Sequence, residues 1–204
     1  MIVLNRQIAT LSPDHPHYPA ALLHQSSPTP FRAAGPLEIL HLPATGFFCS
    51  SQCPGAIILK TFDAITALRD QQQLVIGGFH SPMEWECLGI LLRGRQPVIW
   101  VPARSIDGMH LKPELQPAFT AGRLLILSPF PPKHRRVTAA LAEERNRFVA
   151  ALAGKVFVAH AAPSSRTLAL SEELLRQGKP LVTIDHPANG NLLGMSGVHG
   201  LAQF

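Results

Sequence analysis

Residues 155–184 read KVFVAHAAPSSRTLALSEELLRQGKPLVTI, and this stretch decides the fold. The apolar run 155–159 and the run 181–184 each predict a strand. Between them the pattern of 167–176 predicts a helix, which ends before Gly178. Because both strands are apolar throughout, the sheet that contains them must be covered on both faces. A strand, a helix and a strand in this order indicate a parallel sheet of the α/β class.

The same alternation runs upstream to residue 46. The predicted strands there are 46–50, 74–77, 97–101 and 124–127, and the predicted helices are 54–69, 83–92, 113–120 and 138–152. Strands that alternate with helices in this way predict a doubly wound, mostly parallel α/β sheet, an extended Rossmann-like fold. We expect residues 46–204 to form this domain. Residues 1–45 are rich in proline and show little periodicity, so we expect an N-terminal extension that packs on the core.

The composition excludes several classes of protein. The chain has 204 residues, 46% of them hydrophobic and 15% charged, with a formal net charge of +5. That is enough apolar material for one buried core, and it excludes an acidic disordered protein, a disulfide miniprotein and a histone-like polycation. The sequence contains no evident export signal and no apolar run near the ~20 residues that span a bilayer. We therefore expect a cytoplasmic protein with reduced cysteines and no membrane association.

Cys49, Cys53 and Cys87 do not match a zinc-binding pattern, because the C-x3-C pair lacks a second spaced pair. We interpret them as small buried apolar side chains and expect no metal site. A Ser-His-Asp arrangement is conceivable from Ser50, from His80 or His160, and from Asp185. No G-x-S-x-G motif positions a serine nucleophile, however, so we expect no catalytic residues.

In an open α/β sheet, ligands bind outside the carboxyl ends of the strands, so the loops after the strands are the candidate site. Small hydroxyl and glycine residues in these loops are suited to hold phosphate. The candidate lining residues are Ser50, Ser51, Gly77, Gly78, His80, Ser165 and Thr167. No loop carries G-x-G-x-x-G or a Walker A motif, so no dinucleotide or nucleotide cofactor is indicated.

Basic residues gather in one part of the chain. Six of the 18 Lys and Arg residues lie within residues 133–155, which contain only Glu143 and Glu144 as acids. Guanidinium groups bind phosphate through two parallel hydrogen bonds, so this patch is suited to nucleic-acid backbone. The two glutamates offer the alternative that the arginines are neutralised on an ordinary solvated helix face. The candidate phosphate-binding residues are Lys133, Arg135, Arg136, Arg145, Asn146, Arg147 and Arg166.

Several stretches in order resemble the DNA-processing protein A (DprA/Smf) family. Tyr18-Pro-Ala-Ala-Leu22 is similar to the family's YPxxL, and Pro30-Phe-Arg-Ala-Ala-Gly35 to its P-x-x-L-Y-x-x-G. Gly77-Gly78 resembles the opening of its SGxAxGID segment. Arg145-Asn146-Arg147 with the apolar residues that follow looks like its R-N-R-I-I-A-G-L-S, and Ser165-Arg-Thr-Leu168 resembles its S-G-S-L. The resemblance extends from about residue 11 to 204.

This resemblance implies a protein that binds single-stranded DNA, passes it to a RecA-type recombinase and acts in DNA uptake and recombination. It also implies a homodimer without catalytic activity or cofactor. Arg145 and Arg147 would contact phosphate, and Asn146 would shape the turn or bind a sugar or base. By the same resemblance we expect the bare core of the family, without an N-terminal helical domain or a C-terminal winged helix.

The chain departs from the family pattern at four positions. Where the family has G-S-R, this chain has Cys49-Ser-Ser51, so the arginine is missing. Ala142 stands three positions before Arg145, where the family has an aromatic residue. Glu84 takes the place of the aspartate of SGxAxGID, and Arg166 replaces the glycine of S-G-S-L. The resemblance implies that the family's aromatic residue stacks on a base of the DNA, and such stacking is worth ~1–3 kcal/mol per base. Without this residue, we expect weaker binding to DNA.

Two alternatives therefore stay open. One is a nucleotide-binding domain or nucleoside-monophosphate hydrolase that uses the same pocket, since Thr167 and Glu172 resemble part of the P-G-G-x-G-T-x-x-E motif of a related Rossmann-like family. The other is a protein-interaction module that binds neither DNA nor nucleotide. A basic groove would favour nucleic acid, and a small closed cavity with Glu84 or Glu172 inside would favour a nucleotide.

Overall fold

The structure is a computed structural model that describes residues 2–24 and 27–201. Its strands are β1 (Ile8–Leu11), β2 (Phe31–Ala34), β3 (Ala44–Cys49), β4 (Leu74–Gly77), β5 (Val98–Trp100), β6 (Leu124–Ser128), β7 (Lys155–His160), β8 (Leu181–Ile184) and β9 (Val198–Leu201). Its α-helices are α1 (Ala20–Leu23), α2 (Gly55–Asp70), α3 (Pro82–Leu92), α4 (Gln116–Thr120), α5 (Ala139–Leu152), α6 (Arg166–Arg176) and α7 (Gly190–Leu193). Short 3-10 helices cover Leu4–Gln7, Leu37–His41, Pro113–Leu115 and Pro187–Asn189.

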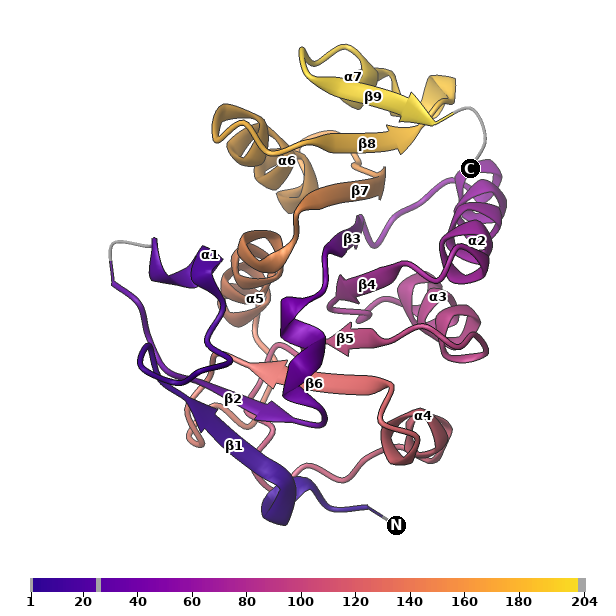
Figure 1. Cartoon of the computed structure of the whole chain (residues 1–204). Helices are drawn as coiled ribbons and strands as arrows, with labels where there is room; N and C mark the ends of the chain where they lie inside the picture. Colours follow the sequence, from indigo (N-terminus) through magenta and orange to yellow (C-terminus); the bar gives the residue numbers. More distant parts are fainter. Residues whose placement is uncertain (1, 25–26, 202–204) are drawn as a thin grey trace.

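The described strands form one sheet in the order β1-β2-β6-β5-β4-β3-β7-β8-β9 (Figure 1). All neighbours from β6 to β9 are parallel, and β1 and β2 pair antiparallel at one edge. From β3 the chain builds one half of the parallel sheet through β4, β5 and β6. It then returns to the other side of β3 and builds the second half through β7, β8 and β9. This doubly wound α/β fold is the one that the sequence predicts.

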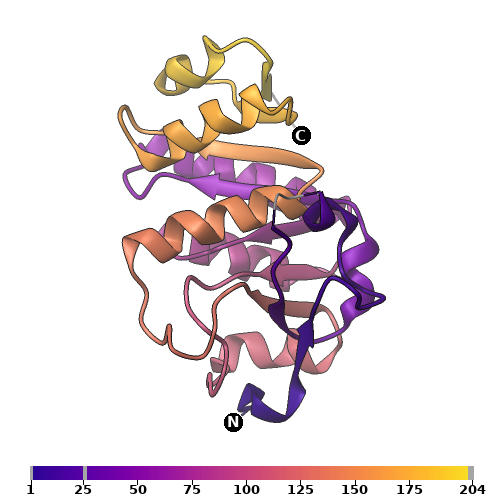
Figure 2. The same ribbon diagram turned by 90° about the vertical axis from the view of Figure 1, so that its left-hand side faces the viewer.

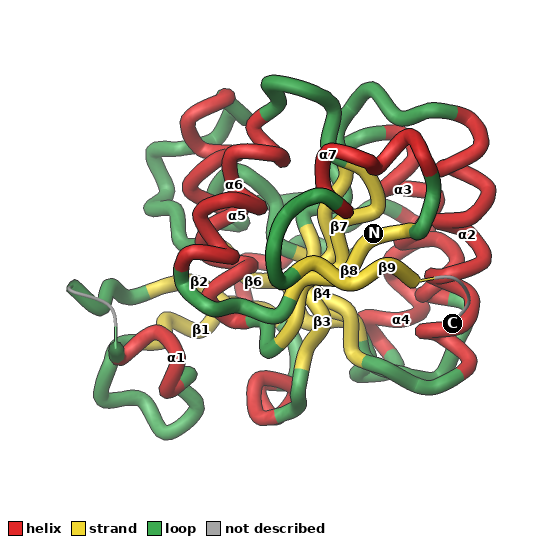
Figure 3. Tube along the Cα trace, turned by 90° about the horizontal axis from the view of Figure 1, so that it is seen from above, coloured by secondary structure: helices red, strands yellow, loops and turns green. Residues whose placement is uncertain are grey.

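Helices cover both faces of the sheet (Figures 1 and 3). Helices α2, α3 and α4 lie on one face, and α1, α5 and α6 lie on the other; Figure 2 shows α5 and α6 in orange and gold across the sheet. Strand β6 explains the need for two layers. Its Leu124 and Ile126 pack in the cluster that contains Ile65 of α2, while Leu125 and Leu127 pack in the cluster with helix α5. Burial of both faces is why these strands are apolar throughout.

The predicted strands and helices from residue 46 to 184 are all present, with ends shifted by at most two residues. In the N-terminal segment, β2 pairs with β6 and β1 pairs with β2, so both strands extend the sheet. Strand β3 begins at Ala44, next to the predicted boundary at residue 45. The division into an extension and a domain stays a prediction. Within the described residues, no helix is long and apolar enough to cross a membrane.

Candidate functional site

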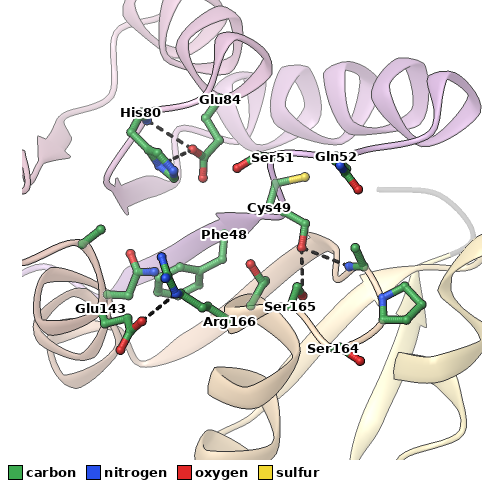
Figure 4. Close-up of a pocket in the computed structure, with 16 residues that line it drawn as sticks. Phe48, Cys49, Ser51, Gln52, His80, Glu84, Glu143, Ser164, Ser165 and Arg166 are labelled. Carbon is green, nitrogen blue, oxygen red and sulfur yellow. Dashed lines mark hydrogen bonds and ion pairs between the residues drawn. The ribbon is translucent and has the colours of Figure 1, made fainter. Parts of the chain in front are cut away.

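A hollow of about 470 Å³ lies where the two halves of the sheet diverge, at the carboxyl ends of β3 and β7. Figure 4 shows the residues that line it. Ligands of open α/β sheets bind at this topological switch point. The lining residues are Phe48, Cys49, Ser50, Ser51, Gln52, His80, Glu84, Ala142, Glu143, Asn146, Ala162, Pro163, Ser164, Ser165, Arg166 and Thr167. We call this hollow the switch-point pocket.

Hydroxyl groups join the two loops at the base of this pocket. The backbone N–H of Ala162 donates to Ser50 Oγ at 3.0 Å, and Ser50 Oγ donates to Ser165 Oγ at 3.1 Å. Ser165 also caps helix α6, because its Oγ accepts from the Leu168 N–H at 3.1 Å. The predicted residues Ser50 and Ser165 therefore lie together, yet their hydroxyls already have protein partners.

His80 and Glu84 form a pair on the wall opposite the Glu143–Arg166 pair in the view of Figure 4. His80 Nδ1 lies 2.8 Å from Glu84 Oε2, and the same carboxylate accepts from the N–H groups of His80 and Ser81 at 3.1 Å. Burial by itself raises the pKa of Glu84. Hydrogen bonds from His80 and Ser81 and the charges of His80 and Arg145 outweigh it, so the pKa of Glu84 lies below its ordinary value. Glu84 is an ionised cap of helix α3, with its capping box to Ser81 complete.

Arg145 is not on the predicted positive rim. Its side chain is 1% exposed, and its Nη1 donates to the carbonyl of Val101 at 3.0 Å while its Nε donates to Asn146 Oδ1 at 2.7 Å. Burial lowers the pKa of Arg145 below its ordinary value, and the charge of Glu84 opposes this shift. A guanidinium enclosed in this way has no face open to a phosphate. Arg145 is therefore not the phosphate contact that the sequence predicts, and its role is structural.

Gly77 and Gly78 also differ from their predicted place, because neither lines the pocket. Gly78 lies against the Arg145 guanidinium, so closely that a Cβ at this position would overlap Nη1 and Cζ. The glycine at the end of β4 is therefore required by the buried arginine. Its neighbour Gly77 is packed against the ring of Phe79.

The other two candidate arginines near the pocket are paired with carboxylates. Arg166 Nε lies 2.6 Å from Glu143 Oε1, and Arg147 Nε lies 3.3 Å from Glu173 Oε2. Both pairs join helix α5 to helix α6. Arg147 does not line the switch-point pocket but a second hollow of about 250 Å³, lined by Glu143, Asn146, Arg147, Arg166, Ala169, Leu170 and Glu173. The partner of Glu143 is thus Arg166 of the next helix, outside residues 133–155, and the acid that pairs with Arg147 is Glu173.

The remaining predicted cations lie on the loop between β6 and α5, where Lys133, Arg135 and Arg136 are exposed. This loop contacts the loop after β5: Ser105 N–H donates to the carbonyl of His134 at 2.7 Å. Arg104, which the sequence argument passed over, lines a hollow of about 290 Å³ together with Arg135. Within the described residues these four cations form no ion pair with a carboxylate. We call Arg104, Lys133, Arg135 and Arg136 the basic loop cluster.

The contacts do not assemble the conceivable Ser-His-Asp arrangement. Ser50 bonds to Ser165 and Ala162 as above, and His160 Nδ1 lies 2.8 Å from Asn189 Oδ1. Glu172, the acid implied by the hydrolase resemblance, is exposed and lies outside the pocket lining, whereas Thr167 is part of it.

The three cysteines are unbridged, with Cys49 and Cys87 buried. A hydrogen bond between Cys49 and Cys53 raises the pKa of Cys49, with burial adding to the rise, and lowers the pKa of Cys53. In the part of the chain that the structure describes, no group of three or more His, Cys, Asp or Glu side chains is arranged to hold a metal ion.

Fold and pocket together define a doubly wound α/β protein with a pocket at its switch point. The family model described as DNA recombination-mediator protein A matches residues 9–201, so the chain belongs to this family. The resemblance noted from the sequence is thereby confirmed.

Solved structures agree in fold. DNA processing protein A from Streptococcus pneumoniae is similar with a TM-score of 0.80 and 18% identity, over 98% of this chain and 73% of that one. The Helicobacter pylori protein of the same name, studied for its single-stranded DNA binding mode, has a TM-score of 0.78 and 18% identity, over 97% and 92%. The molybdenum cofactor carrier protein of Chlamydomonas reinhardtii is less similar, with a TM-score of 0.54 and 14% identity, over 79% and 91%. A comparison with the curated proteins found no match.

Proposed function

We propose that this protein binds single-stranded DNA in a DNA-processing and recombination role, and that the basic loop cluster holds the phosphate backbone. The observation that carries this proposal is the basic loop cluster on two adjoining loops, whose cations form no ion pair with a carboxylate of the described residues. Asp107 lines the same hollow as Arg104 and Arg135, but its carboxylate pairs with Arg32. Lys and Arg side chains without internal partners can neutralise phosphates. This releases the counterions condensed on the nucleic acid, which drives association. Membership of the family supports the DNA-processing role.

The cluster and the switch-point pocket lie at the same carboxyl ends of the parallel strands. Parallel strands end at the same edge of a sheet, so the loops after β6, β5, β4, β3 and β7 follow one another along that edge. The four strand intervals from β6 to β7 amount to ~19 Å at ~4.8 Å each. A short stretch of single strand can therefore lie along this edge from the basic loop cluster toward the pocket.

The loop that carries the cluster is firmly seated. Phe130 and Leu141, which flank it, are buried together with Ala103 of the neighbouring loop. The ring of His134 packs against Phe130 with centroids 6.2 Å apart. Val137, 60% exposed beside Arg136, offers an apolar surface to a base, although no aromatic ring stands on this loop's exposed part. A seated loop loses little conformational entropy on binding.

We propose a binding role rather than a catalytic one, with a RecA-type recombinase and a second copy of this chain as the partners. The Ser50 hydroxyl donates to Ser165, and His160 is hydrogen-bonded to Asn189 rather than to a serine. Neither residue is therefore arranged as a hydrolytic nucleophile or base, which supports a binding role. Glu172 lies outside the pocket lining, and Glu84, which lines it, is held as the cap of helix α3, so neither acid favours a nucleoside-monophosphate hydrolase.

The test is the affinity for labelled oligo-dT, measured by fluorescence anisotropy over a range of salt concentrations. The variant Arg135→Ala/Arg136→Ala should bind about tenfold or more weakly, and its slope of log K against log salt should be smaller by roughly 1.4, since each lost phosphate contact on a single strand contributes ~0.7. The matched control is Arg93→Ala/Arg95→Ala. These two exposed arginines precede β5, at the amino-terminal ends of the parallel strands, and their substitution changes the net charge by the same amount.

Equal affinity of both double variants and the unchanged protein would contradict the placement of the DNA on the basic loop cluster. No binding of oligo-dT by the unchanged protein at low salt would contradict the function itself. In that case, release of free base from nucleoside monophosphates would establish the hydrolase alternative instead.

A further inference from the structure

The Glu143–Arg166 pair stands between two hollows of the molecule. Both residues line the switch-point pocket of about 470 Å³, and both also line the second hollow of about 250 Å³ between α5 and α6. Asn146 is the one other residue that the two linings share. The pair therefore lies at the boundary of both hollows. Figure 4 shows its contact between α5 and α6 as a dashed line.

The geometry of the pair is that of an occupied anion site. Arg166 is the cation of the switch-point pocket, and the carboxylate of Glu143 lies 2.6 Å from its Nε. A guanidinium binds carboxylate and phosphate with the same planar set of N–H donors. A phosphate group that binds the Nε edge of Arg166 must therefore displace Glu143, and the nearby carboxylate repels a phosphate that approaches the rest of the guanidinium.

The exchange is within reach of a ligand. The side chains of Arg166 and Glu143 are 63% and 40% exposed, and an ion pair this open to water contributes little to stability. A phosphate chain that already interacts with the basic loop cluster would encounter the pair as it extends along the sheet edge. Breaking it would join the two hollows into one groove across α5 and α6.

We propose that Glu143 is a selectivity-determining residue of this site, which holds Arg166 away from phosphate and closes the groove to all but ligands that can displace it. The proposal rests on the proposed binding of single-stranded DNA. It predicts that the protein binds DNA through the basic loop cluster with Arg166 largely silent, and that loss of the Glu143 charge brings Arg166 into the contact.

The experiment is a double-mutant cycle with oligo-dT by fluorescence anisotropy. Glu143→Gln should raise the affinity about three- to tenfold and steepen the slope of log K against log salt by roughly 0.7, the value for one added phosphate contact on a single strand. Arg166→Ala alone should change the affinity less than about twofold, because Arg166 is held by Glu143. The double variant Glu143→Gln/Arg166→Ala should lose most of the gain.

Glu144→Gln is the matched control. Glu144 is the next residue on α5, is exposed and lines neither hollow, yet its substitution changes the net charge equally. An equal gain for Glu144→Gln, or a gain that persists in the double variant, would overturn the proposal in favour of a general charge effect. An unchanged affinity of Glu143→Gln would overturn it as well.

The outcomes also separate this proposal from the function on which it rests. If the unchanged protein binds oligo-dT and Arg135→Ala/Arg136→Ala weakens it, the function stands whatever Glu143→Gln does. If the unchanged protein and the Glu143→Gln variant both fail to bind at low salt, the proposed function fails first. Thermal unfolding of each variant verifies that it is folded, and the exposed positions of Glu143 and Arg166 predict little change in that measurement.

Discussion

Arg145 shows how a single buried cation can fix the shape of a site. Its guanidinium lies on Gly78, donates to the carbonyl of Val101 and is attracted by the charge of Glu84. The ends of β4 and β5 are thereby tied to helix α5. A residue that sequence reasoning assigns to phosphate instead holds the strand ends from which the site loops begin.

Gly78→Ala is expected to destabilise the protein by about 1–3 kcal/mol, because the added methyl group overlaps the Arg145 guanidinium. The measurement is the free energy of unfolding in urea. Arg145→Met should cost about 3 kcal/mol on its own, since Glu84 keeps its burial and loses a nearby cation. In the Arg145→Met background the cost of Gly78→Ala should fall, because the obstacle is smaller and flexible.

Gly89→Ala provides the control for this prediction. Gly89 lies within helix α3, and a Cβ there meets no atom within 4 Å. Alanine should therefore be neutral or stabilising by up to about 1 kcal/mol. A Gly78→Ala variant as stable as Gly89→Ala would contradict the packing of Arg145 on Gly78.

The carboxylate of Glu84 gives the protein a predictable response to acid. Its pKa in the folded state lies below the ordinary 4.5, so the folded state holds its proton less readily than the unfolded chain. The stabilisation is present above about pH 4.5 and is lost as the pH falls through the lowered pKa.

The urea midpoint of the unchanged protein should therefore fall between roughly pH 6 and pH 3, and Glu84→Gln should flatten this dependence. Glu86→Gln is the comparison, since Glu86 is an exposed residue of the same helix. Identical pH profiles for the Glu84→Gln variant and the unchanged protein would show that Glu84 is not the group responsible.

At the scale of elements, helix α6 depends on its cap for its place beside the pocket. Ser165 accepts from the Leu168 N–H and from the Ser50 hydroxyl, so one side chain ends a loop, begins a helix and joins β7 to β3. The sequence predicts this helix to start at Thr167, and the capped helix starts at Arg166.

Ser165→Ala should lower the stability by about 1 kcal/mol, the ordinary cost of a lost helix N-cap. Unfolding in urea checks this value. Ser51→Ala is the control, because Ser51 is exposed on the rim of the same pocket and its hydroxyl makes no hydrogen bond within the described residues. A loss for Ser51→Ala as large as for Ser165→Ala would show that the cap is not the cause.

The elements that the sequence argument missed leave weak patterns for physical reasons. Strand β9, Val198–Leu201, contains a histidine and a glycine and is partly exposed at the edge of the sheet. Strand β1 is the opposite edge strand, and β2 lies between it and β6. The edge strands β1 and β9 are covered on fewer sides, so they need not be apolar throughout and leave a weak pattern. Strand β2 is buried at three of its four positions, but a run of four residues with an arginine is too short to give a clear period.

At the scale of the whole molecule, the fold redistributes the positive charge that the sequence concentrates. Of the cations in residues 133–155, Arg145 is buried and Arg147 is paired with Glu173. Lys155 is the first residue of β7, so it lies at the amino-terminal end of the parallel strands, away from the pocket. The remaining three stay on one loop, where Arg104 joins them from the loop after β5. The mild net charge of +5 thus includes a local group of cations, unpaired within the described residues, at the carboxyl ends of the parallel strands.

The order of strands and helices in the parallel sheet and the membership of the family can both be predicted from the amino-acid sequence. Both follow from local patterns: apolar strands that must be buried on two faces, and short motifs that stay in order along the chain. The position of the pocket followed as well, because parallel strands place their following loops at one edge.

Only the tertiary structure decided which cations remain available to a ligand. Arg145 is enclosed by Gly78 and Val101, and Arg166 is held by Glu143, although these partners lie far along the chain. The availability of a charge depends on the side chains that other elements bring against it, and a charge pattern along the sequence does not contain that information.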